Sequence, residues 1–519
     1  MNAPLHREIP AAVLDTAQAL TDVSARWDGD IVKQISDYIT IPAKSPSFDK
    51  DWAGRGHIDT VMRNAAVWVE AQKVEGLKLE VIRMEGRTPV LFFEVPASSG
   101  SAKAERRAGP PQASSAPSGG STLHDVKSVG ARKTVLMYGH LDKQPEFTGW
   151  RSDLGPWTPK YEDGKLFGRG GADDGYAVYA SIAAIQALKS QNVPHPRIVG
   201  LVETCEESGS YDLLPYVDAL RTRLGDVGLV ICLDSGAGNY DQLWLTTSLR
   251  GMASGVLKVQ ILTEGVHSGD ASGLVPSSFR IMRQVLDRLE GSRTGTLLPQ
   301  SFHCEIPADR LAQAKATAQI LGDQIYKRFP WAHYDCGGAT TFALPTTTDP
   351  VEALLNRTWK PTLSVTGADG FPEMGNAGNV LRPYTAFKLS LRLPPLVDAA
   401  RAVQELKALL EDNAPYQAKV TFESAGGATG WNAPATAPWF DKALQDASQA
   451  CYGAPCGTIG QGGTIPLMNM LSQGFPKAQM MVCGVLGPKS NAHGPNEFLH
   501  VPYAKKITAA VAHVIAQMP

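Results

Sequence analysis

Residues 133–142 read KTVLMYGHLD, and this stretch sets the interpretation of the whole chain. The apolar run at 134–138 does not alternate with polar residues, which is typical of a strand buried on both faces of a sheet. A Gly-His-Leu-Asp tetrapeptide follows at once, so polar side chains stand where that strand ends. Residues 197–202, 228–233 and 479–485 have the same character, and the sequence therefore predicts several buried strands.

Segments with apolar residues at helical spacing separate these strands. Residues 176–189 carry Val178, Ile182, Ile185 and Leu188, and residues 503–517 repeat the pattern near the C-terminus. Strands that alternate with helices indicate an α/β fold with a mostly parallel sheet.

The middle of the chain has a different pattern. Residues 255–262 (GVLKVQIL) and 386–393 (AFKLSLRL) alternate apolar and polar side chains, as half-exposed strands do. Amphipathic helices are predicted at 277–290 and 398–411. We therefore expect a second, α+β domain at 248–425, inserted into a first domain formed by residues 1–247 and 426–519.

Residues 97–131 are rich in Ser, Gly, Ala and Pro and contain few large apolar side chains. Such a segment buries too little surface to offset the entropy lost on ordering. Strand-like residues flank it at 89–96 and 133–138. We predict a flexible insertion within the first domain rather than a domain boundary.

Composition excludes several classes of protein. The chain has 49 Lys+Arg and 51 Asp+Glu, a formal charge of −2, which argues against a broad nucleic-acid footprint or a polybasic membrane surface. Seven cysteines without CxxC spacing favour a reducing compartment. The N-terminal residues form no secretory h-region, and no apolar stretch approaches the ~20 residues that span a bilayer. We expect a cytoplasmic protein.

Acidic and imidazole side chains follow the predicted strands. In an open α/β sheet, ligands bind beyond the carboxyl ends of the strands. Each motif alone is more often a surface polar pair, a helix cap or a solvated turn, but all of them together indicate a divalent metal site without thiolate ligands. The candidate residues are His140, Asp142, Asp173, Asp174, Glu206, Glu207, Asp234 and His493.

The motifs GHLD, GRGGADDG, CEESGS, CLDSG, NAHGPNEF, GVHSG and SLRLP give the chain a family resemblance. It resembles the carnosinase and cytosolic dipeptidase branch of the co-catalytic zinc metallopeptidases, from about Lys33 to the C-terminus except for 97–131. Aminoacylase, succinyl-diaminopimelate desuccinylase and glutamate carboxypeptidase are more distant relatives.

The resemblance implies a site for two divalent metal ions, with zinc the first expectation and manganese or cobalt as alternatives. Asp173 would bridge the two ions. His140 and Asp234 would complete one coordination sphere, and Glu207 and His493 would complete the other.

The resemblance also implies the catalytic groups. Glu206 would be the general base for a hydroxide that bridges the metals. Asp142 would accept a hydrogen bond from the far nitrogen of His140 and fix its tautomer. The peptide bond between Asp173 and Asp174 would be cis.

Four further residues match substrate-binding positions of the branch. The resemblance makes the inserted domain at 248–425 a lid on a catalytic domain, and His267 would reach across a homodimer, formed through this lid domain, to stabilise the oxyanion. Arg392 would hold the substrate's terminal carboxylate. Thr464 would be a hydroxyl donor, and Asn379 stands where the branch usually carries Thr. Each residue also has a structural alternative. His267 could be a loop histidine, and Arg392 could form an ion pair on its strand. Thr464 could belong to an ordinary glycine turn, and Asn379 could cap a loop.

The chain departs from the branch just before Gly462. Gly460 and Gln461 stand where the branch usually has Arg-Glu, so a charge pair near the substrate end is missing. No match to the branch's second lid histidine is found around Trp431. These departures leave the identity of the dipeptide open.

The leading functional interpretation is a dizinc dipeptidase that acts on short peptides with a free C-terminal carboxylate. The alternative on the same fold is an amidohydrolase that deacylates N-acyl amino acids. A catalytically silent binding protein is disfavoured, because it would have lost metal ligands or Glu206. The charges around Arg106 are too few for a nucleic-acid surface.

Overall fold

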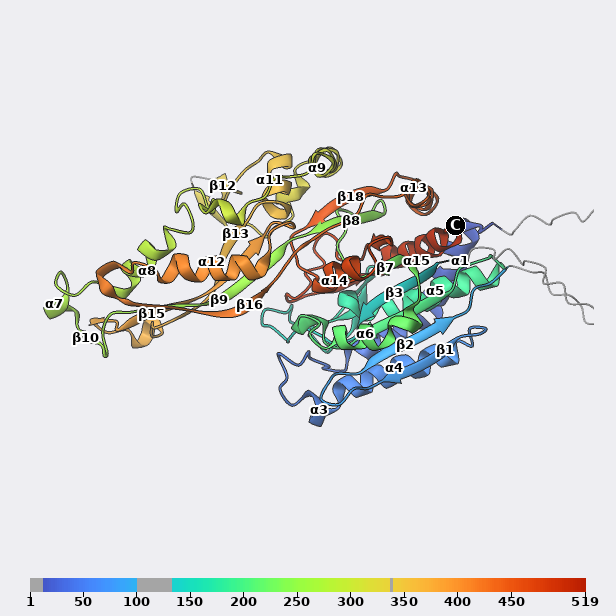
Figure 1. Ribbon diagram of the computed structural model, residues 1–519, viewed down its shortest axis with the longest axis horizontal. Helices are drawn as coiled ribbons and strands as arrows, with labels where there is room; N and C mark the ends of the chain where they lie inside the picture. The colour runs from blue at the N-terminus through green and yellow to red at the C-terminus, as the bar shows by residue number, and fades with distance from the viewer. Residues whose placement is uncertain (1–12, 100–132, 337–338) are drawn as a thin grey trace, which may run out of the picture.

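The computed structural model describes residues 13–99, 133–336 and 339–519. Its two largest sheets lie in two lobes, toward opposite ends of the long axis (Figure 1). The larger lobe contains both ends of the described chain. The smaller lobe is built from the middle of the chain. The strand β10 (Val266–His267) lies at its far tip.

Six strands form the sheet of the larger lobe, and four of them are parallel neighbours, as predicted for an α/β fold. The antiparallel strands β1 and β2 form one edge. The apolar runs seen in the sequence become the parallel strands. The order is β1 (Lys78–Ile82), β2 (Val90–Val95), β6 (Ile198–Glu203), β3 (Thr134–His140), β7 (Val227–Cys232) and β19 (Gln479–Val482).

Helices cover both faces of this sheet, which explains why its strands are apolar throughout. Val135 and Met137 of β3 pack in a core with α5 (Ala177–Ser190) and α15 (Val501–Ala516). Leu136 and Tyr138 face the opposite core, with α6 (Leu213–Leu224) and α14 (Pro466–Gly474). Every residue of β3 is therefore buried.

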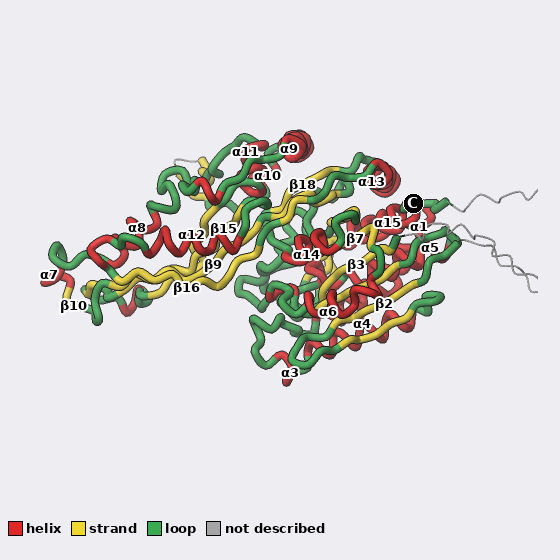
Figure 2. Tube along the Cα trace, viewed as in Figure 1, coloured by secondary structure: helices red, strands yellow, loops and turns green. Residues whose placement is uncertain are grey.

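The smaller lobe holds a four-stranded antiparallel sheet. Its order is β13 (Thr362–Asp369), β15 (Tyr384–Leu393), β9 (Gly251–Gln260) and β16 (Lys419–Ala428). The helices α8 (Ser278–Leu286) and α12 (Ala399–Glu411) lie on one side of it (Figure 2). Asp398 caps α12 by accepting the Arg401 N–H at 2.8 Å, as the sequence predicted.

A three-stranded sheet lies where the chain passes from one lobe to the other. β8 (Trp244–Leu249) leads directly into β9 and pairs with β17 (Trp431–Asn432) and β18 (Gly457–Gln461). The helices α9 (Ala308–Leu321) and α11 (Pro350–Thr358) pack against β18. Part of the predicted lid thus contacts the C-terminal segment, and the division of the chain into domains stays a prediction.

The predicted insertion at 97–131 lies almost entirely outside the described residues. Only its first three residues belong to them, and Ser98 pairs with His195 there. Within the described ranges, every helix is too short or too polar to cross a membrane.

Candidate functional site

The carboxyl ends of three parallel strands bring the predicted ligands to one edge of the larger sheet. His140 is the last residue of β3 and pairs with Glu203, the last residue of β6. Glu206 and Glu207 lie in the turn that follows β6, and Asp234 follows β7. Asp173 comes from the turn Gly171–Gly175 before α5, and its peptide bond to Asp174 is cis. His493 comes from the loop beyond β19.

Asp173 lies between the two histidines. Its Oδ1 is 3.4 Å from His140 Nε2, and its Oδ2 is 2.9 Å from His493 Nε2. Asp234 Oδ2 lies 3.9 Å from His140 Nε2, and Glu207 Oε2 lies 3.4 Å from His493 Nε2. The five side chains therefore form two histidine-carboxylate pairs on either side of one shared carboxylate.

Two overlapping sets of side chains are close enough to share an ion. The ligand atoms of His140, Asp173 and Glu207 all lie within 4.8 Å of one another, and so do those of His140, Glu206 and Asp234. Imidazole nitrogen and carboxylate oxygen are ligands that zinc, manganese and cobalt accept. The donor set and its spacing fit a divalent metal centre.

His140 is oriented as a metal ligand. Its Nδ1 is 3.1 Å from the backbone oxygen of Asp142 and 3.5 Å from Asp142 Oδ1. Its Nε2 is buried and has no hydrogen-bond partner among the described residues. With the proton on Nδ1, the lone pair of Nε2 is free for a metal, so this orphaned atom supports the centre.

The carboxylate of Asp142 makes contacts beyond the one that was expected. Its Oδ1 lies 3.5 Å from His140 Nδ1, and the expected hydrogen bond between them stays a prediction. The carboxylate also accepts the N–H groups of Glu206 at 3.1 Å and Glu207 at 3.0 Å. Asp142 thereby fixes the turn that carries the two glutamates.

The site concentrates acidic groups that are costly to bury together. Burial raises the pKa of Glu207 to about 8 and that of Asp234 to about 7. Burial, helped by the nearby Asp234 carboxylate, also raises the pKa of Glu206 well above its usual range. A bound divalent cation would favour the ionised forms of all three groups.

Two residues that the sequence did not single out support the loop of His493. The Arg169 guanidinium donates to the backbone oxygens of His493 at 3.1 Å and Gly494 at 2.9 Å, and it forms an ion pair with Glu497. The side chains of Arg169 and Glu497 are 1% and 0% exposed. Glu497 also accepts the Gly170 N–H at 2.9 Å. The pair ties the His493 loop to the turn that precedes Asp173.

A cavity of about 1000 Å³ connects the acid-histidine cluster with Arg392. Arg392 Nη1 donates to Thr464 Oγ1 at 3.2 Å, and that hydroxyl donates to the Arg250 backbone oxygen at 2.5 Å. No carboxylate of the described residues pairs with Arg392. Glu206, Glu207 and His493 line the same cavity. The Arg392 guanidinium thus lies in the same cavity as some of the predicted metal ligands, without an acidic partner among the described residues.

His267 and Asn379 lie together at the far tip of the smaller lobe and do not line this cavity. β10 pairs with β14 (Val380–Leu381), and the Asn379 backbone oxygen accepts the Ser268 N–H at 2.9 Å. Both side chains are exposed. Figure 1 shows β10 at the end of the lobe that is farthest from the larger sheet. Within one chain, these two predicted residues stay away from the site.

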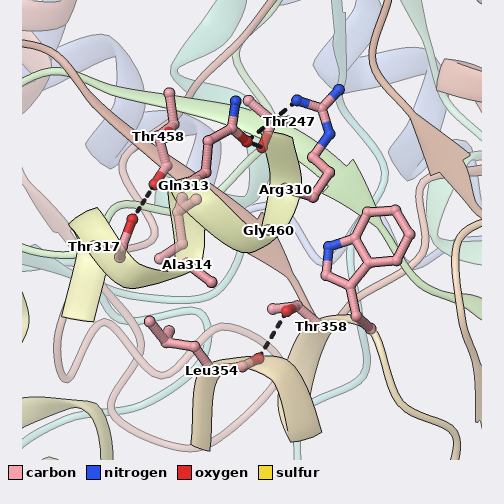
Figure 3. A pocket seen from close by; sticks show the side chains of 11 residues that line it. Thr247, Arg310, Gln313, Ala314, Thr317, Leu354, Thr358, Thr458 and Gly460 are labelled. Atoms are coloured by element: carbon pink, nitrogen blue, oxygen red, sulfur yellow. Dashed lines mark hydrogen bonds between the residues drawn. The ribbon is translucent and has the colours of Figure 1, made fainter. Parts of the chain in front are cut away.

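Gly460, which stands where the dipeptidase branch usually has the arginine of an Arg-Glu pair, is closely surrounded by other residues. A small cavity of about 20 Å³ lies beside Gly460, between residues of α9 and α11 (Figure 3). This volume holds about one water molecule. A Cβ atom at Gly460 would lie 2.7 Å from Ser248 Oγ and 3.0 Å from Thr358 Cβ. The surroundings therefore have no space for a larger side chain at position 460.

Comparison with known protein families gives one match that spans most of the site. A family model described as "Peptidase family M20/M25/M40" matches residues 136–517. This range contains every predicted metal ligand.

Curated relatives resemble most of the chain. A cysteinylglycine-S-conjugate dipeptidase from Corynebacterium striatum is 29% identical over 399 residues, which cover 74% of this chain and 82% of that protein. The Cys-Gly metallodipeptidase dug1 of Schizosaccharomyces pombe is 26% identical over 385 residues, which cover 71% of this chain and 76% of that protein. The human Beta-Ala-His dipeptidase is 24% identical over 368 residues, which cover 69% of this chain and 70% of that protein.

Solved structures resemble the fold across nearly the whole chain. Human carnosine dipeptidase 1 has a TM-score of 0.72 at 19% identity, with 98% of this chain and 99% of that chain covered. The dipeptidase Dug1p of Saccharomyces cerevisiae has a TM-score of 0.71 at 19% identity, with 97% of this chain and 98% of that chain covered.

Proposed function

Because this chain belongs to peptidase family M20/M25/M40 and is a metal-dependent peptidase, we propose that it cleaves dipeptides or short peptides with a free C-terminal carboxylate. One observation carries this proposal: Glu206, Glu207 and His493 line the same cavity as Arg392, whose guanidinium forms no ion pair with a described carboxylate. The relatives named as dipeptidases support the same substrate size.

The metal centre is proposed to hold two divalent ions, and zinc is our assignment. His140 and Asp234 would bind one ion, His493 and Glu207 would bind the other, and Asp173 would contribute one oxygen to each. When bound, such ions polarise a carbonyl and supply a nucleophile near neutral pH. Asp142 and Arg169 keep the ligands in place through the contacts described above.

Glu206 is proposed to be the general base. It lines the cavity and lies beside the ligands, with Oε2 3.9 Å from His140 Nε2. Its carboxylate can take a proton from the attacking water at Oε1 or Oε2 and then deliver it to the leaving amine. The backbone N–H of Glu206 donates to Asp142, which holds the turn that carries the side chain.

Arg392→Met is expected to raise KM for a dipeptide at least about tenfold, because a bidentate guanidinium-carboxylate contact is lost. The same loss is expected when the wild-type enzyme is given the dipeptide with a C-terminal amide. The variant should discriminate little between acid and amide. Steady-state kinetics on the four combinations of enzyme and substrate measure this. If Arg392→Met still favours the acid as strongly as the wild-type enzyme does, Arg392 does not bind the carboxylate.

A substrate panel tests the proposed activity itself. Alanyl-alanine-type dipeptides and N-acetyl amino acids share the terminal carboxylate and differ in the free amine. We expect faster hydrolysis of the dipeptides by metal-analysed protein. Faster removal of the acetyl group would replace the dipeptidase by the deacylase alternative.

His267 is proposed to act on the site of a second subunit in a homodimer. The exposed tip that carries His267 and Asn379 lies away from the site of its own chain, which supports this proposal.

Mixing two inactive variants tests the cross-subunit role. We expect Glu206→Gln and His267→Ala each to be inactive alone. After the subunits are exchanged at equal concentration, activity should reach about a quarter of the wild-type value, because half of the dimers regain one complete site. A mixture no more active than either parent would show that His267 serves its own chain or has no catalytic role.

A further inference from the structure

A second cavity, of about 360 Å³, shares no lining residue with the substrate cavity. Its volume falls in the range of small-molecule sites. Its walls come from the loop after β7, from α9, α10 (Gln324–Lys327) and α11, and from the segment between β19 and His493. The lining residues used below are Gly238, Tyr240, Asp241, Arg328, Arg357 and Pro488.

Two guanidinium groups face this cavity without an ion-pair partner among the described residues. Neither Arg328 nor Arg357 forms an ion pair or a side-chain hydrogen bond with a described residue, and Arg357 Nε is buried without a partner. Burial, together with the charges of Arg328 and Arg250, lowers the pKa of Arg357 to about 9. Asp241 is the only acid among the described residues lining the cavity, and it is exposed to solvent.

Such an arrangement is unfavourable without a bound anion. Charged side chains are rarely buried unless they are paired, and like charges in one cavity repel each other. The wall opposite is rigid, because the Tyr240 ring stacks on His500 at 4.1 Å and its hydroxyl donates to the Pro488 backbone oxygen at 3.3 Å. Two partly buried guanidiniums in one cavity offer several N–H donors to an oxyanion.

We propose that this cavity binds a small oxyanion, a carboxylate or a phosphate group, between Arg328 and Arg357. The proposal does not depend on the substrate of the active site.

The walls of the cavity connect an occupant to the catalytic loops. The segment of Gly238 and Tyr240 follows Asp234, and Pro488 precedes His493 in the loop held by Arg169. The backbone oxygen of Arg357 lies against Gly462, where an added Cβ would meet it at 3.2 Å. A bound anion would therefore stabilise segments that lead to both proposed metal sites and to Thr464.

Thermal unfolding and calorimetry with the metal-loaded protein test the proposal. Inorganic phosphate and succinate are titrated separately, with sodium chloride at equal ionic strength as the reference. We expect at least one of them to raise Tm more than chloride does, and the double variant Arg328→Gln/Arg357→Gln to weaken that binding at least about tenfold. Binding of phosphate alone or of succinate alone identifies the group that the cavity prefers.

The variants separate this cavity from the active site. Arg283→Gln changes an exposed arginine of α8 and should leave anion binding unchanged. Without anion, the double variant should be at least as stable as the wild-type protein, because two unpaired charges are gone. Arg328→Gln alone gives the same comparison if the double variant does not fold. The proposal is overturned if neither anion exceeds chloride, if the anion effect survives in the double variant, or if only Arg392→Met removes it.

Discussion

Glu206→Gln is expected to lower kcat/KM by about 10²- to 10⁴-fold, the range that a positioned general base contributes, while the metal content stays unchanged. Gln has the size of Glu but cannot accept a proton from water. The Glu206 carboxylate lines the cavity and accepts no hydrogen bond from the described residues, so its removal breaks no structural contact of that side chain. The backbone contact with Asp142 Oδ1 remains in the variant.

Glu203→Gln is the matched control. Glu203 ends β6 only three residues earlier, and its carboxyl group accepts hydrogen bonds from Tyr138 at 2.7 Å and Ser210 at 2.8 Å, outside the cavity. Burial raises its pKa to about 8, so it is mostly protonated at pH 7 and resembles an amide. Its replacement should change kcat/KM little. Kinetics with metal analysis of both variants would refute the role of Glu206 if the two losses were equal, or if Glu206→Gln kept full activity.

Much of the site could be predicted because parallel strands all end at one edge of a sheet. The apolar run at 134–138 predicts a buried strand, and His140 must then lie at its carboxyl end, beside the residues that follow β6 and β7. The structure brings His140, Asp173, Glu206, Glu207, Asp234 and His493 together there. Their individual roles stay predictions.

Other parts of the site depend on distances that a single sequence does not contain. Arg169 and Glu497 are 328 residues apart in the chain and form a buried pair, yet each alone resembles an ordinary charged residue in a glycine-rich loop. The space at Gly460 is set by Ser248 and Thr358, which come from two other segments. The second cavity is missed for the same reason, because Arg328 and Arg357 meet only after α10 and α11 pack.

Asp173→Asn is expected to reduce the affinity for at least one metal ion by more than about 100-fold, beyond the effect of changing a residue that only supports a ligand. In the structure, one oxygen of Asp173 faces His140 and the other faces His493. An amide keeps one oxygen, and its NH₂ group does not bind metal, so one of the two bridging contacts is lost. Activity should fall to that of the metal-depleted enzyme. Metal content after dialysis, together with zinc titration, measures the change.

Asp174→Asn is the control for Asp173→Asn, because it removes a neighbouring buried carboxyl group that is not proposed to bridge the metal ions. Burial, helped by the nearby Asp234 carboxylate, raises the pKa of Asp174 well above its usual range, which favours the neutral form that an amide resembles. Burial would also raise the pKa of Asp173, but the two facing imidazoles lower it below its usual range, so this neighbour is ionised. Only the ionised acid has two oxygens to offer two cations. The Asp174 variant should therefore keep both metal ions, and an equal loss of metal from the two variants would mean that Asp173 is not the bridge.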